Sequence, residues 1–197
     1  MGWEVARSRK VSRSAPTRPG RPSPRDAARA VAPRAATRQV MTFLVRFALG
    51  WICALLLVSF VPGIERWAIR GTLHSLGWLA GLFTPSVEVA EPAFTLGGTR
   101  VNIVPDCTPL MPTTALWMAI LAFPSSGRWK LVGALAGAAV LWLYNLGRIL
   151  ATVAVLKMRP EWFDFVHVYL WQTLTVVVLF ALFVLWMRFE PRRRVAS

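Results

Sequence analysis

Residues 131–155 read LVGALAGAAVLWLYNLGRILATVAV, and residues 166–189 read VHVYLWQTLTVVVLFALFVLWMRF. A helix needs roughly 20 apolar residues to cross the hydrocarbon core of a bilayer, and each run is long enough. Between them, residues 157–164 hold a proline and four charged side chains, which are typical of a connecting turn. The two runs therefore predict two membrane-spanning helices joined by a short connector.

Two further apolar runs lie upstream of this pair. Met41–Val61 is apolar apart from Arg46, which can extend its charged head toward the membrane surface. The Pro62-Gly63 pair that follows it breaks a helix. Leu110–Phe123 is shorter, and residues 124–130 form the turn after it. Together the four runs predict about four transmembrane helices.

The segment between the first and second spans has a different character. Trp67–Phe83 is short and interrupted by charge and glycine, so it predicts an interfacial or re-entrant helix, with a full span as the open alternative. Residue types alternate in Val87–Ala90 and in Arg100–Val104, and Gly97-Gly98 offers turn chemistry between them, which predicts a short β-hairpin. The expected fold is an all-α polytopic membrane protein with these two additions.

Composition supports a membrane protein with basic ends. The chain has 197 residues, is 55% hydrophobic and carries a formal net charge of +14, and the high apolar content argues against a soluble fold. It holds two cysteines, which argues against a disulfide framework. Residues 1–39 are rich in Arg, Pro, Ser and Ala and predict a disordered tail. A lipid-facing role is favoured for this tail, with nucleic-acid binding and a signal peptide as weaker alternatives.

The distribution of basic residues predicts the orientation. Ten lie in the tail 1–39, one is Arg46, two lie in the turn 124–130, and four lie at the end of the last span or after it, which places 17 of the 23 on one side of a four-span protein. The positive-inside rule makes that side cytoplasmic. Residues 1–39 and 190–197 are then cytoplasmic tails, and the hairpin is extracytoplasmic. The predicted location is the cytoplasmic membrane, with multiple passes.

This orientation brings three reactive residue types to the outer membrane level. Cys107 begins the second span, Arg148 lies late in the third, and His167 begins the fourth. A thiolate is a good nucleophile, an imidazole can move protons near neutral pH, and a guanidinium can stabilise an oxyanion. Each also has a structural alternative: an inert thiol, an arginine paired with Asp106 or Asp164, and an interfacial histidine.

The remaining cysteine and histidine suggest no second chemistry. Cys53 lies in the middle of the first span, about 15 Å below its end at the helical rise of 1.5 Å per residue, so a disulfide with Cys107 is not expected. We interpret Cys53 as a packing residue and His74 as an interfacial one. Neither histidine has neighbours at a familiar metal-ligand spacing, and no metal or cofactor is predicted.

Three short motifs together resemble a known family. They are Val104–Leu110 (VPDCTPL), Asn145–Ile149 (NLGRI) and Phe163–His167 (FDFVH). The ordered Cys, Asn-x-x-Arg and His set is similar to the exosortase/archaeosortase family, and most like its exosortase H branch, over residues 40–189. One departure is Pro109, since the family usually has glycine two residues after the cysteine.

The resemblance implies a membrane cysteine protease or transpeptidase that cleaves C-terminal sorting signals from exported proteins at the outer face. Its implied nucleophile is Cys107, its oxyanion or thiolate stabiliser Arg148 and its general acid/base His167, with Asn145 orienting Arg148 or the substrate backbone. Implied partners are exported proteins and the bilayer, not nucleic acid. The alternative is a non-catalytic membrane protein, such as an assembly partner or transporter subunit. A thiol oxidoreductase would need a second reactive cysteine nearby.

Overall fold

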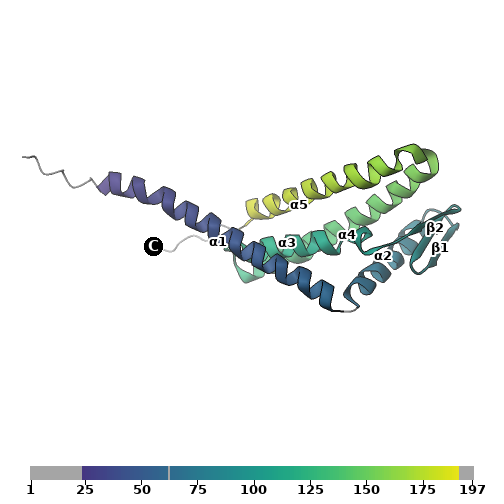
Figure 1. Cartoon of the computed structure of the whole chain (residues 1–197), viewed down its shortest axis with the longest axis horizontal. Coiled ribbons are helices and arrows are strands. Elements are labelled where there is room, and N and C mark those ends of the chain that lie inside the picture. The colour runs from purple at the N-terminus through teal and green to yellow at the C-terminus, as the bar shows by residue number, and fades with distance from the viewer. Residues whose placement is uncertain (1–23, 62, 191–197) are drawn as a thin grey trace, which may run out of the picture. The chain divides into compact units, whose positions relative to one another are not determined.

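The computed structural model describes residues 24–61 and 63–190, with side chains from residue 37 onward (Figure 1). The chain divides into two compact units, Met1–Val40 and Met41–Ser197. The elements are α1 (Pro24–Phe60), α2 (Ile64–Gly81), β1 (Val87–Ala90), β2 (Ala93–Leu96), β3 (Thr99–Asn102), a 3-10 turn η1 (Pro105–Cys107), α3 (Leu110–Ala122), α4 (Gly127–Met158), a second 3-10 turn η2 (Pro160–Trp162), a π-helical segment η3 (Phe165–Leu170) and α5 (Trp171–Arg188).

The first helix begins earlier than expected. Residues 24–39 belong to α1, whereas the sequence predicts disorder over the whole of 1–39. Alanine has the highest helix propensity, and this stretch is rich in it, while Pro24 stands at the helix start, where proline is tolerated. The predicted disorder of residues 1–23 and most of the predicted C-terminal tail, residues 191–197, lie outside the described residues.

Three helices in the described part of the chain are long and apolar enough to cross a membrane. They are Thr37–Phe60, Gly127–Met158 and Pro160–Arg188. They match three of the four expected spans, and they make the protein a helical membrane protein by length and composition. The fourth expected span corresponds to α3, whose 13 residues extend about 20 Å, less than the roughly 30 Å of hydrocarbon. Four spans therefore stay a prediction.

A small sheet replaces the expected hairpin. Three antiparallel strands lie in the order β1-β2-β3, so the two-strand prediction is wrong because it missed β2. Gly97 and Gly98 have φ values of 54° and 82° and connect β2 to β3, the positive values that a tight two-residue hairpin turn requires. The missed strand β2 lies in the middle of the sheet. Its Phe94 side chain is 0% exposed and packs with side chains of the helices.

Two hydrophobic clusters organise the second unit around α4. The first joins α2, the sheet and the later half of α4, and Phe94, Leu76 and Ile149 are among its buried side chains. In Figure 1, α2 runs beside the sheet, and the two are in contact. The second cluster joins α3, the earlier half of α4 and α5, through Leu116 and Trp186. Because α4 belongs to both clusters, it connects the sheet end of the unit to the helical hairpin.

Helices α4 and α5 are held in an antiparallel register by a pair of tryptophans. Trp129 Nε1–H donates to the Trp186 carbonyl at 3.3 Å, and Trp186 Nε1–H donates to the Trp129 carbonyl at 3.1 Å. The Trp186 ring lies directly against Gly133, where any Cβ atom would overlap it. The absence of a side chain at Gly133 thus permits the close helix approach that sets this register.

Replacing Gly133 by valine is expected to destabilise the fold. The added atoms would displace the Trp186 ring, and overpacking of this kind costs about 1–3 kcal/mol. Gly147→Val is the matched control, because it lies in the same helix and a Cβ there meets nothing within 4 Å. Thermal unfolding in detergent should show a lower melting temperature for Gly133→Val than for Gly147→Val. Equal melting temperatures would contradict the close packing.

Candidate active site

Cys107 is the last residue of the 3-10 turn η1, between the sheet and α3. Its N–H donates to the Val104 carbonyl at 2.8 Å, and the Thr108 N–H donates to the Pro105 carbonyl at 3.0 Å. The residue is 7% exposed and packs in the first hydrophobic cluster. Pro109 is also buried and has no N–H. The backbone N–H groups from residue 107 to 109 are therefore either used in the turn or missing.

Asn145 binds the cysteine's own carbonyl. The Asn145 Nδ2 donates to the Cys107 carbonyl oxygen at 2.9 Å, and the side chain is 3% exposed. The sequence interpretation assigned Asn145 to orienting Arg148 or a substrate. The structure instead shows it fixing the position of Cys107 against α4. A buried amide with this bond is a strong positional constraint, since leaving either group unpaired is costly.

Asn145→Ala is expected to lower the free energy of unfolding by about 1–3 kcal/mol, because it leaves the buried Cys107 carbonyl without its partner. Asn102→Ala provides the control, since Asn102 is exposed on the edge strand β3. Thermal unfolding of both variants in detergent measures the difference. A melting temperature for Asn145→Ala as high as that of Asn102→Ala would contradict the proposed constraint.

Arg148 lies one helical turn after Asn145 and reaches the same loop. Its Nη2 donates to the Asp106 carbonyl oxygen at 3.3 Å, and the residue is half-buried. Within residues 63–190 the ion pairs are Arg70–Glu91 and Arg159–Glu161. The expected alternative, an Arg148 side chain neutralised by a carboxylate of Asp106 or Asp164, is therefore not what the structure shows. The guanidinium beside the cysteine loop has no paired carboxylate.

His167 belongs to the π-helical segment η3, which packs against α4. Its ring stacks on Phe163, with ring centroids 5.3 Å apart and planes 6° from parallel. Arg148 and Asp164 are the charged groups that interact electrostatically with the imidazole. Single-turn π-helices occur frequently at functional sites, because the wider winding changes where side chains point. The arrangement associates His167 with Arg148, across two different helices.

A further contact between the helices, missed in the sequence, defines this level of the hairpin. The Tyr144 hydroxyl and Thr175 Oγ1 are 3.1 Å apart, and the Tyr144 ring meets the Trp171 ring edge to face at 6.1 Å. Arg148 lies one turn after Tyr144 on α4. Because α4 and α5 are antiparallel, that turn places Arg148 at the level of η3, the segment that precedes α5. The only sequence signal was that Tyr144 and Arg148 are four residues apart, on one helix face.

The four predicted site residues are thus brought together to different degrees. Hydrogen bonds join Cys107 and its loop to Asn145 and Arg148, while His167 lies in η3, which packs against the helix that carries both of them. Among the residues with described side chains, no hydrogen bond joins Cys107 to His167. A thiol, a cation and an imidazole are the groups that nucleophilic acyl transfer uses.

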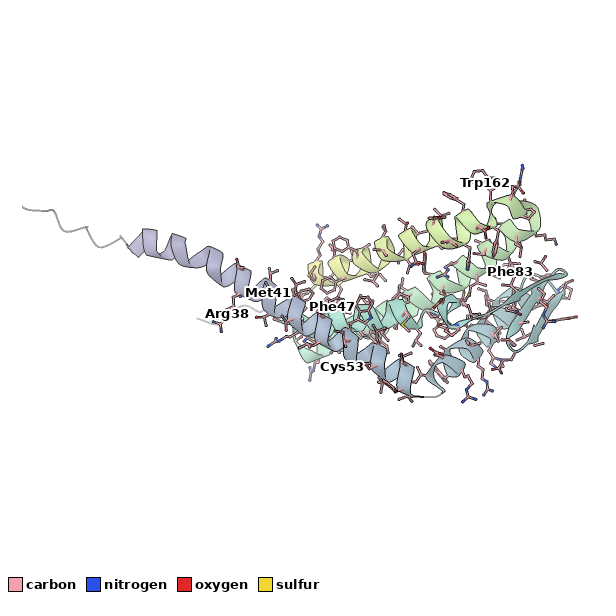
Figure 2. The ribbon with its side chains drawn as sticks, in the orientation of Figure 1. Arg38, Met41, Phe47, Cys53, Phe83 and Trp162 are labelled. Carbon is pink, nitrogen blue, oxygen red and sulfur yellow. The ribbon has the colours of Figure 1, made fainter. Side chains whose placement is uncertain are left out.

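The other cysteine lies apart from this group. Cys53 is exposed on α1 (Figure 2), and its interpretation as a packing residue of the membrane span stays a prediction. An apolar helix that spans a bilayer has lipid around it, so hydrophobic residues need no protein partner there. Both Cys53 and Cys107 are free thiols, as expected. In the described residues, no three His, Cys, Asp or Glu side chains form a metal-binding group.

Comparisons of the chain with protein-family models, with curated proteins and with solved structures found no match. The site is therefore described by its own contacts. Hydrogen bonds connect the loop of the buried Cys107 thiol to Asn145 and to the Arg148 guanidinium, and His167 lies in η3, which packs against the same helix α4.

Proposed function

We propose that this chain is a membrane cysteine peptidase or transpeptidase of the exosortase/archaeosortase kind, which removes C-terminal sorting signals from exported proteins. The observation that supports it most is the pair of hydrogen bonds from one turn of α4 to two consecutive carbonyls, those of Asp106 and Cys107. They hold the cysteine's loop beside a guanidinium for which no carboxylate partner is found among the described side chains. A nearby cation favours the thiolate, the form that attacks a carbonyl.

In the proposed reaction, the Cys107 thiolate attacks the scissile carbonyl carbon and forms a C–S bond. The C–N bond then breaks, and the leaving amine takes a proton from the His167 imidazolium. The substrate is left as a thioester on Cys107. An acceptor amine or water then attacks, gives its proton to His167 and releases the thiolate. This sequence uses one nucleophile and one proton carrier, as in other cysteine-dependent acyl transfers.

Arg148 is the proposed donor to the oxyanion of the tetrahedral intermediate. The N–H groups of Cys107 and Thr108 are already used within the turn, and Pro109 has none. A guanidinium offers several donors in a fixed fork and keeps its charge at all working pH values. Pro109, which departs from the family pattern, is therefore compatible with activity in this proposal, because the Arg148 side chain donates the hydrogen bonds that the backbone does not.

The level of the site in the bilayer also supports the proposal. Arg128 near the start of α4 and Arg188 at the end of α5 are basic residues typical of the cytoplasmic side. Arg148 and His167 each lie about 20 residues from these ends, which at about 1.5 Å per residue is roughly the 30 Å of the hydrocarbon core. Both would then meet a substrate at the outer face of the cytoplasmic membrane.

This level matches the proposed substrate, an exported protein whose tail consists of a short motif, a hydrophobic helix and a basic end. The hydrophobic helix would hold the cleavage site near the outer face, where the reactive groups lie. The test is to sequence the C-termini of exported proteins in wild-type and Cys107→Ala cells. A non-catalytic assembly partner or transporter subunit predicts identical C-termini in the two strains.

A further inference from the structure

Four buried side-chain atoms have no hydrogen-bond partner in the described part of the chain. They are Thr72 Oγ1, Ser125 Oγ, His167 Nδ1 and Trp171 Nε1. Buried polar atoms are nearly always paired, so each exception needs an explanation, and a catalytic or binding role is one of them. Two of the four, the nitrogens of His167 and Trp171, lie one turn apart at the junction of η3 and α5.

These two nitrogens lie beside the candidate active site. Trp171 contacts the Tyr144 ring, and Tyr144 is one turn from Arg148 on α4. His167 lies in η3, which packs against α4, the helix that carries Arg148. The four side chains thus form two levels across the helix pair, with Arg148 and His167 at one level and Tyr144 and Trp171 at the next. On α4 the Tyr144 hydroxyl is already satisfied by Thr175, whereas the indole N–H is not.

The chemistry of the two atoms is complementary to a peptide backbone. An indole N–H can only donate, so it fits a carbonyl oxygen, and an imidazole nitrogen can accept from or give a proton to an amide nitrogen. Along η3 and the start of α5, Trp171 lies four residues after His167, or about 6 Å deeper at the α-helical rise. An extended peptide advances about 3.3 Å per residue, so the spacing corresponds to about two residues.

We propose that Trp171 is a positioning residue that holds the leaving tail of the substrate. Its Nε1–H donates to a carbonyl oxygen within the first two residues after the scissile bond, while His167 Nδ1 faces the amide nitrogen that becomes the leaving amine. The tail then runs along α5 in the same inward direction as the helix itself. This inference rests on the proposed function. It assigns to Trp171 the positioning of the leaving tail, which is separate from the roles of Cys107, Arg148 and His167.

The kinetic test separates the two steps of the reaction. Trp171→Phe keeps an aromatic ring against Tyr144 and removes the N–H. Tail release in a single turnover should slow about 10-fold, roughly the value of one lost hydrogen bond. Breakdown of the thioester on Cys107 should keep its rate, because the tail has already left. Trp171→His, which restores a ring N–H, should recover part of the loss.

A matched control is Trp117→Phe, which removes an indole N–H that already donates to the Ala134 carbonyl at 2.9 Å. It should leave the rate of tail release unchanged. The probe is a reporter protein carrying the tail of an exported protein that Cys107→Ala cells fail to cut, with the enzyme reconstituted in vesicles. An unchanged rate of tail release in Trp171→Phe overturns the inference, as does an equal slowing of both steps, which marks a structural role.

Photo-crosslinking supplies a readout that does not require turnover. In the Cys107→Ala background, benzoylphenylalanine at position 171 should capture uncut precursors, identified by mass spectrometry. The same group in place of Phe180, which is 67% exposed on α5, should capture none. Precursors that accumulate without a crosslink at 171 overturn the role of Trp171 alone. No accumulation of precursors overturns the proposed function and this inference with it.

Discussion

Cells carrying Cys107→Ala are expected to keep the hydrophobic, basic C-terminal tails on a set of exported proteins that wild-type cells cut. Removing the nucleophile of an acyl-transfer enzyme typically lowers the rate by a factor on the order of 10³ or more. The substitution removes one sulfur atom from a residue that is 7% exposed, and it leaves the backbone carbonyl for Asn145 in place. A complete loss of processing would therefore report chemistry rather than unfolding.

The matched control is Cys53→Ala. Cys53 is the other free cysteine, and it is exposed on α1, so the change should leave the C-termini as in the wild type. The measurement is mass spectrometry of intact C-terminal peptides in all three strains, together with the amount of each variant in the membrane. Wild-type processing in Cys107→Ala cells would refute the sorting-enzyme proposal and favour an assembly partner or a transporter subunit.

Arg148→Lys is expected to reduce cleavage by about 100-fold while keeping the positive charge. Loss of one oxyanion donor typically lowers kcat by 10²–10³. The guanidinium of Arg148 reaches the Asp106 carbonyl, and its remaining N–H groups are the donors proposed for the oxyanion. Lysine is a point charge without the planar fork, so it cannot provide both contacts in the same geometry.

The control for Arg148 is Arg70→Lys, at an exposed side chain that pairs with Glu91 at 2.9 Å. Such surface pairs contribute at most about 1 kcal/mol, so cleavage should stay near the wild-type rate. The values of kcat and KM should be measured separately with a reporter substrate. We expect Arg148→Lys to lower kcat with little change in KM, because the oxyanion forms only after attack. An unchanged kcat would assign Arg148 to a structural role.

The membrane helices could be predicted from the chain because hydropathy and length are local properties. The runs Met41–Val61, 131–155 and 166–189 each correspond to a helix long enough to span a bilayer. The strand β2 is as long as β1 and β3, but its residues do not alternate in type, and its Phe94 is buried in a cluster with side chains of α2 and α4. Residues 24–39 combine a composition typical of disorder with alanines of high helix propensity, and the structure includes them in α1.

For the candidate site, the sequence predicted the identity of the residues but not their hydrogen-bond partners. Cys107, Asn145, Arg148 and His167 could be named from three short motifs, since reactive residue types are visible in any sequence. Their partners could not, because a bond such as that from Asn145 to the Cys107 carbonyl joins residues 38 positions apart.

Tertiary packing alone placed Trp171 against Tyr144 and left its N–H without a partner. The physical reason is that hydropathy belongs to each segment by itself, whereas pairing and burial depend on which segments become neighbours once the helices have packed.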